Sequence, residues 1–161
     1  MLNNIKSHAA AYLGITAERI GEATVLNAVY AIAREYLLFV TSASLTAKQN
    51  KIYLNALGKR FLRLKAVFNQ SGRRVRAEIF SNYIRLPEDG KYTLEYYYEP
   101  DTIPYGRLTD NLLGLAAAAE YALSNGLYEK AMLLRDRLRD AMQTVTRDVN
   151  RCRLPARRWH T

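Results

Sequence analysis

The hydrophobic positions of this 161-residue chain change their spacing twice, from a helical period to a period of two and back again. Residues 3–13 predict a short helix that ends at Gly14, because glycine readily takes the left-handed conformation of a helix end. From Glu22 to about Val40, apolar residues recur every three or four positions, which predicts a second helix. A stretch of serine and threonine then interrupts the pattern. Residues 1–47 are therefore expected to form the N-terminal helices of a bundle.

Residues 48–104 follow a period of two, which predicts an antiparallel β insertion. Turn signals at Asn69–Gly72 and Pro87–Gly90 separate the alternating stretches, and Pro100 ends the last one. We expect a small meander with one covered face. The residues expected on that face are Ile52, Leu54, Ala56, Leu62, Leu64, Ala66, Phe68, Val75, Ala77, Ile79, Tyr92, Leu94, Tyr96 and Tyr98.

Helical spacing returns in residues 105–150. Thr109 or Asp110 can cap the first helix of this part, and Asn125-Gly126 predicts a tight break before the next one. The two helices should form an αα-hairpin. The apolar stripe expected on the second helix contains Leu127, Ala131, Leu134, Leu138, Ala141, Val145 and Val149. The predicted fold class is thus α+β and mainly α: a helical bundle with an αα-hairpin, a small antiparallel β-sheet insertion and an extended C-terminal tail.

The tail comprises residues 151–161 and contains four arginines and no acid. A proline within it prevents a helix from continuing. Arginine and tryptophan are the residue types enriched at binding hot spots, so the tail is typical of a docking segment. The residues expected to dock on a partner are Arg151, Arg153, Leu154, Pro155, Arg157, Arg158 and Trp159.

The charge of the chain indicates which kinds of partner it could contact. The formal net charge is +9, and the excess lies in residues 1–65 (nine bases, three acids) and 106–161 (ten bases, six acids). Such a balance suits contact with phosphates or with an acidic protein surface. The single cysteine cannot form an internal disulfide, and no apolar run reaches the length of a membrane span. We expect a soluble protein, made in a cytoplasm, with no membrane contact.

Catalytic and metal-binding signals are missing from the sequence. The two histidines, His8 and His160, lie near opposite ends, and with Cys152 they make no metal-ligand spacing. Neither a phosphate-binding G-x-x-x-x-G-K-[ST] loop nor a G-x-S-x-G elbow occurs. We therefore expect no catalytic residue, no cofactor and no metal, and a protein that is not an enzyme.

Three further clusters each allow two interpretations. Tyr96-Tyr97-Tyr98 could stack on bases, but alternation places Tyr96 and Tyr98 on the covered face, which favours a core role. Arg73, Arg74 and Arg76 follow a turn and form either a solvated rim or a rim that faces DNA or an acidic partner. The mixed charges of 135–148 are typical of a solvated helix surface, with pairing to a neighbouring subunit as the alternative.

The order of helix, β insertion, αα-hairpin and basic tail resembles the head–tail adaptor (connector) proteins of tailed bacteriophages. The resemblance runs from about residue 20 onward and lies in the order and texture of the elements. The segments that carry it are Val25–Val40 with Arg34–Leu38, Tyr83–Tyr92, Leu94–Pro100, Asp110, Ala116–Leu123, Asn125–Ala131 and Leu154–Trp159.

The resemblance implies a structural protein of the virion neck. Such adaptors form a homo-oligomeric ring of about twelve copies, which closes through one repeated heterologous interface. The ring docks beneath the portal protein through the C-terminal segment, surrounds the DNA channel without reading sequence, and meets the tail tube or nozzle protein through its β part. On this chain, the docking segment is the tail, and Arg73, Arg74 and Arg76 are the candidate rim toward the tail or the DNA. The alternative function is a basic nucleic-acid-binding module without enzymatic activity.

Overall fold

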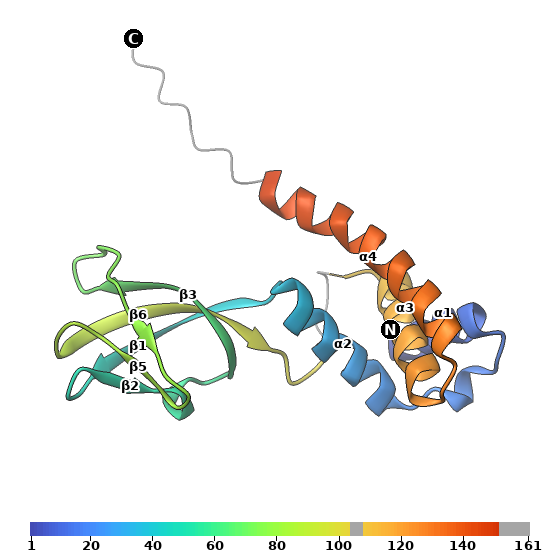
Figure 1. Ribbon diagram of the computed structural model, residues 1–161, viewed down its shortest axis with the longest axis horizontal. Helices are drawn as coiled ribbons and strands as arrows, with labels where there is room; N and C mark the ends of the chain where they lie inside the picture. The colour runs from blue at the N-terminus through green and yellow to red at the C-terminus, as the bar shows by residue number, and fades with distance from the viewer. Residues whose placement is uncertain (104–107, 152–161) are drawn as a thin grey trace, which may run out of the picture. The chain divides into compact units, whose positions relative to one another are not determined.

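The computed structural model describes residues 1–103 and 108–151 and divides the chain into two compact units (Figure 1). The first unit contains residues 1–29 and the chain from Ile103 onward, and the second contains residues 30–102. The elements, in chain order, are α1 (Leu2–Leu13), the 3₁₀ turn η1 (Ala17–Arg19), α2 (Glu22–Tyr36), β1 (Val40–Ala47), β2 (Lys51–Tyr53), the 3₁₀ turn η2 (Leu54–Ala56), β3 (Arg60–Asn69), β4 (Glu78–Ile79), β5 (Tyr83–Arg85), β6 (Gly90–Glu99), α3 (Asp110–Ser124) and α4 (Tyr128–Arg151). The predicted α+β class is confirmed.

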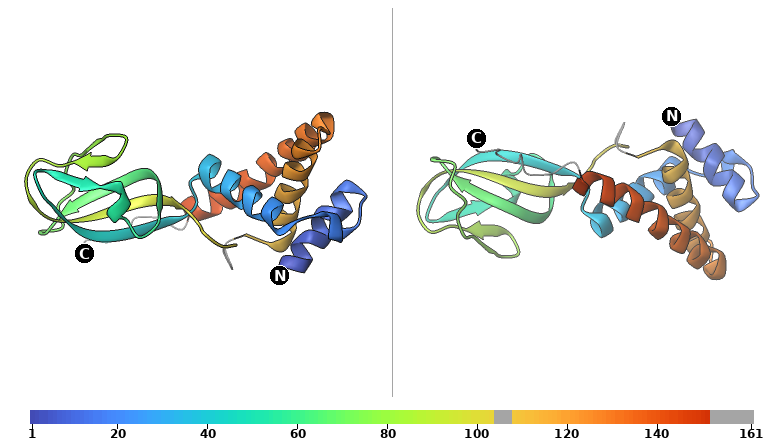
Figure 2. Two further views of the ribbon diagram at one scale, coloured as in Figure 1. Left: turned by 90° about the horizontal axis from the view of Figure 1, so that it is seen from below. Right: turned by 90° about the horizontal axis from the view of Figure 1, so that it is seen from above.

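Helix α3 is the centre of the first unit and contacts both α1 and α4 (Figure 2). Every residue from Leu112 to Ala119 is buried, so this helix has almost no solvent face. The side chains of the four consecutive alanines, Ala116–Ala119, are short, and Gly114 has none, so neighbouring helices can come close to the backbone of α3. A Cβ atom at Gly114 would lie 2.5 Å from the Cβ of His8 on α1. The absence of a side chain at Gly114 is therefore what lets α1 approach α3 so closely.

The predicted helix ends of this unit are confirmed. Gly14 takes a left-handed conformation (φ 70°), and its N–H donates to the carbonyl of Ala10. Thr109 is the N-cap of α3, because its hydroxyl accepts from the N–H of Leu112 at 3.2 Å. Gly126 (φ 74°) forms the break before α4, and the predicted αα-hairpin of α3 and α4 is present.

The buried stripe of α4 differs in part from the prediction. Ala131, Leu134 and Leu138 are buried as expected, but Met142 is fully buried and was not predicted. Leu127, which was expected on this stripe, is 47% exposed. The helix begins only at Tyr128, so Leu127 belongs to the turn and does not follow the helical period.

The predicted second helix was too long. Helix α2 ends at Tyr36, Leu37 adopts a positive φ of 49°, and Val40 is the first residue of β1. The expectation that residues 1–47 are helical was therefore wrong for its last part. Strand β1 does have a period of two, since Ala43 and Leu45 pack against the core while the intervening serines are exposed. Small side chains make that alternation faint in the sequence.

The second unit contains two antiparallel three-stranded sheets with the orders β1-β6-β3 and β2-β5-β4. The strands are antiparallel as predicted, but the meander was wrong, because β6 lies between β1 and β3. Both sheets contribute to one core, around which the strands curve (Figure 1). Its buried residues are Ala47, Ile52, Leu57, Val67, Ile84, Leu86, Tyr92, Leu94 and Tyr96.

Strand β3 departs from simple alternation. Its pairing with β6 is irregular between Phe61 and Arg63 and again between Leu64 and Ala66. A β-bulge adds a residue on one strand and shifts which side chains face inward. As a result Val67, predicted to point outward, is buried in the core at 2% exposure, whereas Phe68 is only partly buried.

The shorter strands were predicted less accurately. The stretch 52–56 forms β2 and then the turn η2, and of the stretch 75–79 only Glu78–Ile79 is a strand. Ile79, expected inside, is 52% exposed. Strand β5 was not predicted at all. The alternation of 92–98 was correct, since Tyr92, Leu94 and Tyr96 are buried and the strand ends before Pro100.

Candidate interaction surfaces

The predicted docking tail falls almost entirely outside the described residues. Arg151 is the last residue of α4. The other residues predicted to dock, Arg153, Leu154, Pro155, Arg157, Arg158 and Trp159, lie beyond it. The docking role of the tail stays a prediction.

The structure brings Arg73, Arg74 and Arg76 together after a well-defined turn. The Oδ1 atom of Asn69 accepts hydrogen bonds from the N–H groups of Ser71 and Arg73, at 3.1 and 2.9 Å. All three arginines are exposed. Arg74 also donates from Nη2 to the carbonyl of Lys65 on β3, at 3.3 Å, and this bond holds its side chain across the neighbouring strand.

Arg74 and Arg76 border a hollow between β3 and the segment that leads into β4. The hollow has a volume of about 460 Å³ and is open to solvent. Its walls are aliphatic at their base and basic at their rim, a combination suited to a ligand with both apolar and negative groups. The lining residues are Leu64, Lys65, Ala66, Val67, Arg74, Val75, Arg76, Ala77 and Ile79.

An exposed apolar patch lies at the start of α4. The patch consists of Leu127, Tyr128, Met132 and Leu133, with exposures of 47, 65, 68 and 54%. These side chains lie off the stripe that packs against α3, since that stripe is Ala131, Leu134, Leu138 and Met142. Several large apolar side chains exposed within residues 127–133, in the turn and the first helical turns of α4, are typical of a protein contact.

An aromatic cluster is exposed on the sheet β2-β5-β4. The rings of Phe80 and Tyr83 are stacked with centroids 4.6 Å apart, and Tyr53 meets Tyr83 edge-on at 6.2 Å. The ammonium group of Lys51 lies 5.0 Å from the centroid of the Tyr83 ring. Sequence reasoning missed this cluster. The available signal was Tyr53, an aromatic at a position where alternation with Ile52 predicts a polar residue.

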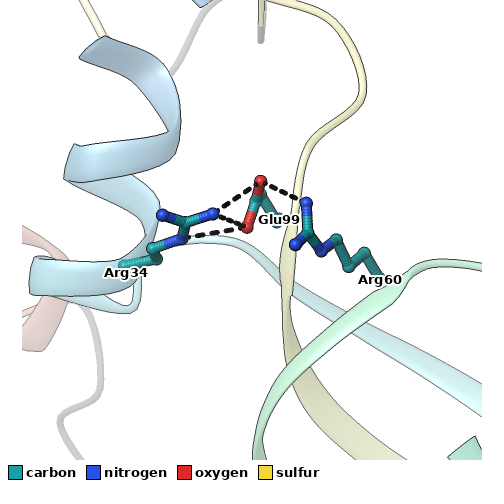
Figure 3. A network of polar contacts seen from close by, with 3 residues as sticks. All are labelled: Arg34, Arg60 and Glu99. Atoms are coloured by element: carbon teal, nitrogen blue, oxygen red, sulfur yellow. Dashed lines mark hydrogen bonds and ion pairs between the residues drawn. The ribbon is translucent and has the colours of Figure 1, made fainter. Parts of the chain in front are cut away.

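Among the described residues, Glu99 is the acidic residue that is buried, with an exposure of 2% (Figure 3). Arg34 of α2 donates to it from Nε at 3.1 Å and from Nη2 at 3.2 Å, and Arg60 of β3 donates from Nη1 at 3.0 Å. Both arginine side chains are more than half exposed. A carboxylate that is satisfied from two sides by solvated arginines ties together the ends of three elements, and this is a structural role.

The tyrosine run has the core role that alternation favoured. Tyr96 is 1% exposed and packs beside Phe61 with ring centroids 5.9 Å apart. Burial raises the pKa of the Tyr96 phenol, an effect that a backbone hydrogen bond at Lys59 partly offsets. A ring enclosed in this way offers no face for a base to stack on.

The charged side chains of α4 from Arg135 to Asp140 are exposed in the single chain, and their pairing with a neighbouring subunit stays an alternative prediction. Arg135, Arg137, Arg139 and Asp140 are exposed, and Arg139 pairs with Asp136 at 3.1 Å within the helix. An exposed pair of this kind contributes little to stability. No ion pair between these residues and another element is recorded in the described part of the chain.

Among the side chains that the structure describes, no group of three or more histidine, cysteine or acidic residues could hold a metal ion. Within residues 1–103 and 108–151, no helix is both long and apolar enough to cross a membrane. No protein-family model matches this chain, and no curated protein matches it either.

Proposed function

We propose that this protein is a structural subunit of a phage neck, a head–tail adaptor that assembles as a ring beneath the portal and joins capsid to tail. The observation that carries the proposal is the exposed apolar patch of α4. A helical hairpin with one face packed on its own unit and a second apolar face uncovered is suited to side-by-side packing with copies of itself.

The surroundings of the patch support the same proposal. Lys130, between the patch residues, reaches the carbonyl of Leu13 at 2.7 Å and ties the start of α4 to the end of α1. The patch therefore stands on a helix that is anchored within its unit. A pre-ordered surface loses less conformational entropy on association than a loose one, so it favours a repeated contact.

The basic balance of the chain suits a ring around DNA. A net charge of +9 favours a polyanion nearby without reading its sequence. The tail, residues 151–161, is the segment proposed to reach the portal, and the second unit is the part proposed to face the tail tube or nozzle protein.

The test is electron microscopy and mass photometry of the full chain with the portal protein encoded in the same genome. We expect closed rings on the portal. The double variant Tyr128→Asp/Met132→Asp should prevent ring formation while circular dichroism stays unchanged, and Gln143→Asp, an exposed change on the same helix, is the matched control. Deleting residues 151–161 should abolish docking on the portal. A tail-deleted chain that still docks with the same affinity, or rings unaffected by the double variant, would contradict the proposal.

The second candidate is a nucleic-acid-binding module, favoured by the three exposed arginines Arg73, Arg74 and Arg76. This function requires binding of short duplexes with an affinity that falls steeply with salt, because each phosphate contact releases counterions. Fluorescence anisotropy with a labelled duplex between low and physiological salt distinguishes it from the adaptor. No binding at low salt excludes the module.

A further inference from the structure

The two sheets of the second unit are joined by hydrogen bonds along one side, whereas their strands on the other side leave an opening. Between β1 and β2, Lys48 and Lys51 exchange two backbone hydrogen bonds of 3.1 Å, so the two sheets are continuous there. On the opposite side, β3 and β4 are the outer strands of their sheets. The segment that leads into β4 pairs with β3 near the turn, where the N–H of Val75 donates to the carbonyl of Val67 at 2.9 Å.

Beyond that contact, the described residues show no backbone hydrogen bond between β3 and this segment, and a hollow of about 460 Å³ lies between them. The bulges of β3 bend this strand beside the hollow. Along Arg60–Leu64, the described residues pair with β6 on one side of the strand and with no strand on the other, and at Lys65 the carbonyl accepts from Nη2 of Arg74 at 3.3 Å. We call this opening the seam. It combines an outer strand edge with a hollow floored by Val67, Val75 and Ala77.

We propose that the seam is a docking site for an extended, acidic segment of a partner protein. An extended peptide adds to an outer strand through its backbone and places alternate side chains toward the floor. In the seam, its apolar side chains would contact the aliphatic floor, and the side chains between them would face the rim. The proposal concerns the second unit alone and does not depend on ring formation.

Charge identifies the occupant as acidic. The chain from Arg60 to Ile79 contains six bases and one acid. Lys65 and Arg60 are already paired, with Glu95 and Glu99. Four arginines remain that form no ion pair within the described residues: Arg63, Arg73, Arg74 and Arg76. Like charges across an interface are costly, so this rim disfavours the chain's own arginine-rich tail and favours carboxylates.

A nucleic acid would also meet the arginines, but the floor of the seam argues against it. Its walls carry small aliphatic side chains, whereas sites for single strands present aromatic faces to bases. The exposed aromatic rings of this unit, Tyr53 and Phe80, do not line the hollow.

The test uses the full chain and a fluorescein-labelled peptide of about ten residues that alternates glutamate and valine, long enough to span the open edge. We expect saturable binding in fluorescence anisotropy and none for the lysine–valine peptide of equal length. The double variant Arg74→Glu/Arg76→Glu should weaken binding roughly tenfold or more, because it reverses the rim charge. The matched control is Arg135→Glu/Arg137→Glu on α4, which changes the net charge equally and should bind as the parent chain does.

A second peptide tests the extended backbone. Replacing a central valine by proline removes an N–H and should reduce binding strongly. Circular dichroism confirms that each variant is folded. The proposal is overturned if the glutamate–valine peptide does not bind, if the rim variant binds it as well as the α4 control does, or if the proline peptide binds equally. Preferential binding of a labelled single-stranded oligonucleotide through the same arginines also overturns it.

Discussion

Replacing Gly114 with alanine is expected to destabilise the helical unit, although alanine is the better helix former. The new Cβ atom would lie 2.5 Å from the Cβ of His8 and 3.1 Å from the backbone N of Ala9 and the backbone O of Ile5. None of these atoms is the end of a flexible side chain, so α1 must move away from α3. Overpacking of this kind costs about 1–3 kcal/mol.

Helix propensity opposes that cost. Alanine is favoured over glycine within a helix by about 0.8–1.0 kcal/mol. The net loss in the free energy of unfolding is therefore at most about 2 kcal/mol, measured by urea denaturation with circular dichroism. Gly58→Ala is the control, since nothing lies within 4 Å of a Cβ there and its φ is not positive. That change should be neutral or stabilising by under about 1 kcal/mol.

A double-mutant cycle identifies the cause. His8→Gly removes the Cβ atom nearest to the new methyl group, so Gly114→Ala should cost less in that background, by about 1 kcal/mol. If Gly114→Ala stabilises the parent chain by the full amount of about 0.8–1.0 kcal/mol that helix propensity alone predicts, the close packing of α1 on α3 is refuted. An equal cost in both backgrounds would attribute the effect to the backbone atoms of α1.

Three pairs of substitutions test other parts of the fold. Glu99→Ala should lower the free energy of unfolding by about 1–3 kcal/mol, because it removes the shared acceptor of two arginines. Arg34→Ala should cost less, because its side chain is 56% exposed and Arg60 still donates to the carboxylate. A larger loss from Arg34 would contradict this order. Thr109→Ala should cost about 1 kcal/mol through the lost N-cap of α3, and Thr109→Ser should retain most of the stability. Val67→Asp should lower the free energy of unfolding by at least about 2 kcal/mol more than Phe68→Asp does. The reverse order would mean that Phe68 faces the core and Val67 does not, as simple alternation along β3 predicts. Urea denaturation measures all of them.

The helix ends were predictable because their determinants are local. A glycine with a positive φ at residue 14, a threonine whose side chain accepts from the N–H three residues later, and the Asn125-Gly126 pair each act within one turn of chain. The same reasoning explains the error in α2. Its last turn and β1 contain no proline or glycine, so nothing local marks the change from helix to strand between Tyr36 and Val40.

Strand order was not predictable for the opposite reason. Strand β6 pairs with β1 and β3, which are distant in sequence, while its chain neighbour β5 joins the other sheet. Alternation identifies which residues are buried within one strand, but it contains no information on partners. It also fails where the backbone is irregular, since the bulges of β3 exchange the roles of Val67 and Phe68 without altering the sequence pattern.

The candidate sites depend on the same long-range arrangement. Alternation along β6 places Glu99 outward with Glu95, yet Glu99 is buried because guanidinium groups 65 and 39 residues away in sequence converge on it. Arg73, Arg74 and Arg76 could be found from composition, since a basic cluster after a turn is exposed in almost any fold. The hollow that they border could not be found, because only the folded chain brings the bulged strand β3 beside residues 74–79. The charge of such a surface is thus readable from the sequence, whereas the shape that would select an extended ligand arises only from strand pairing.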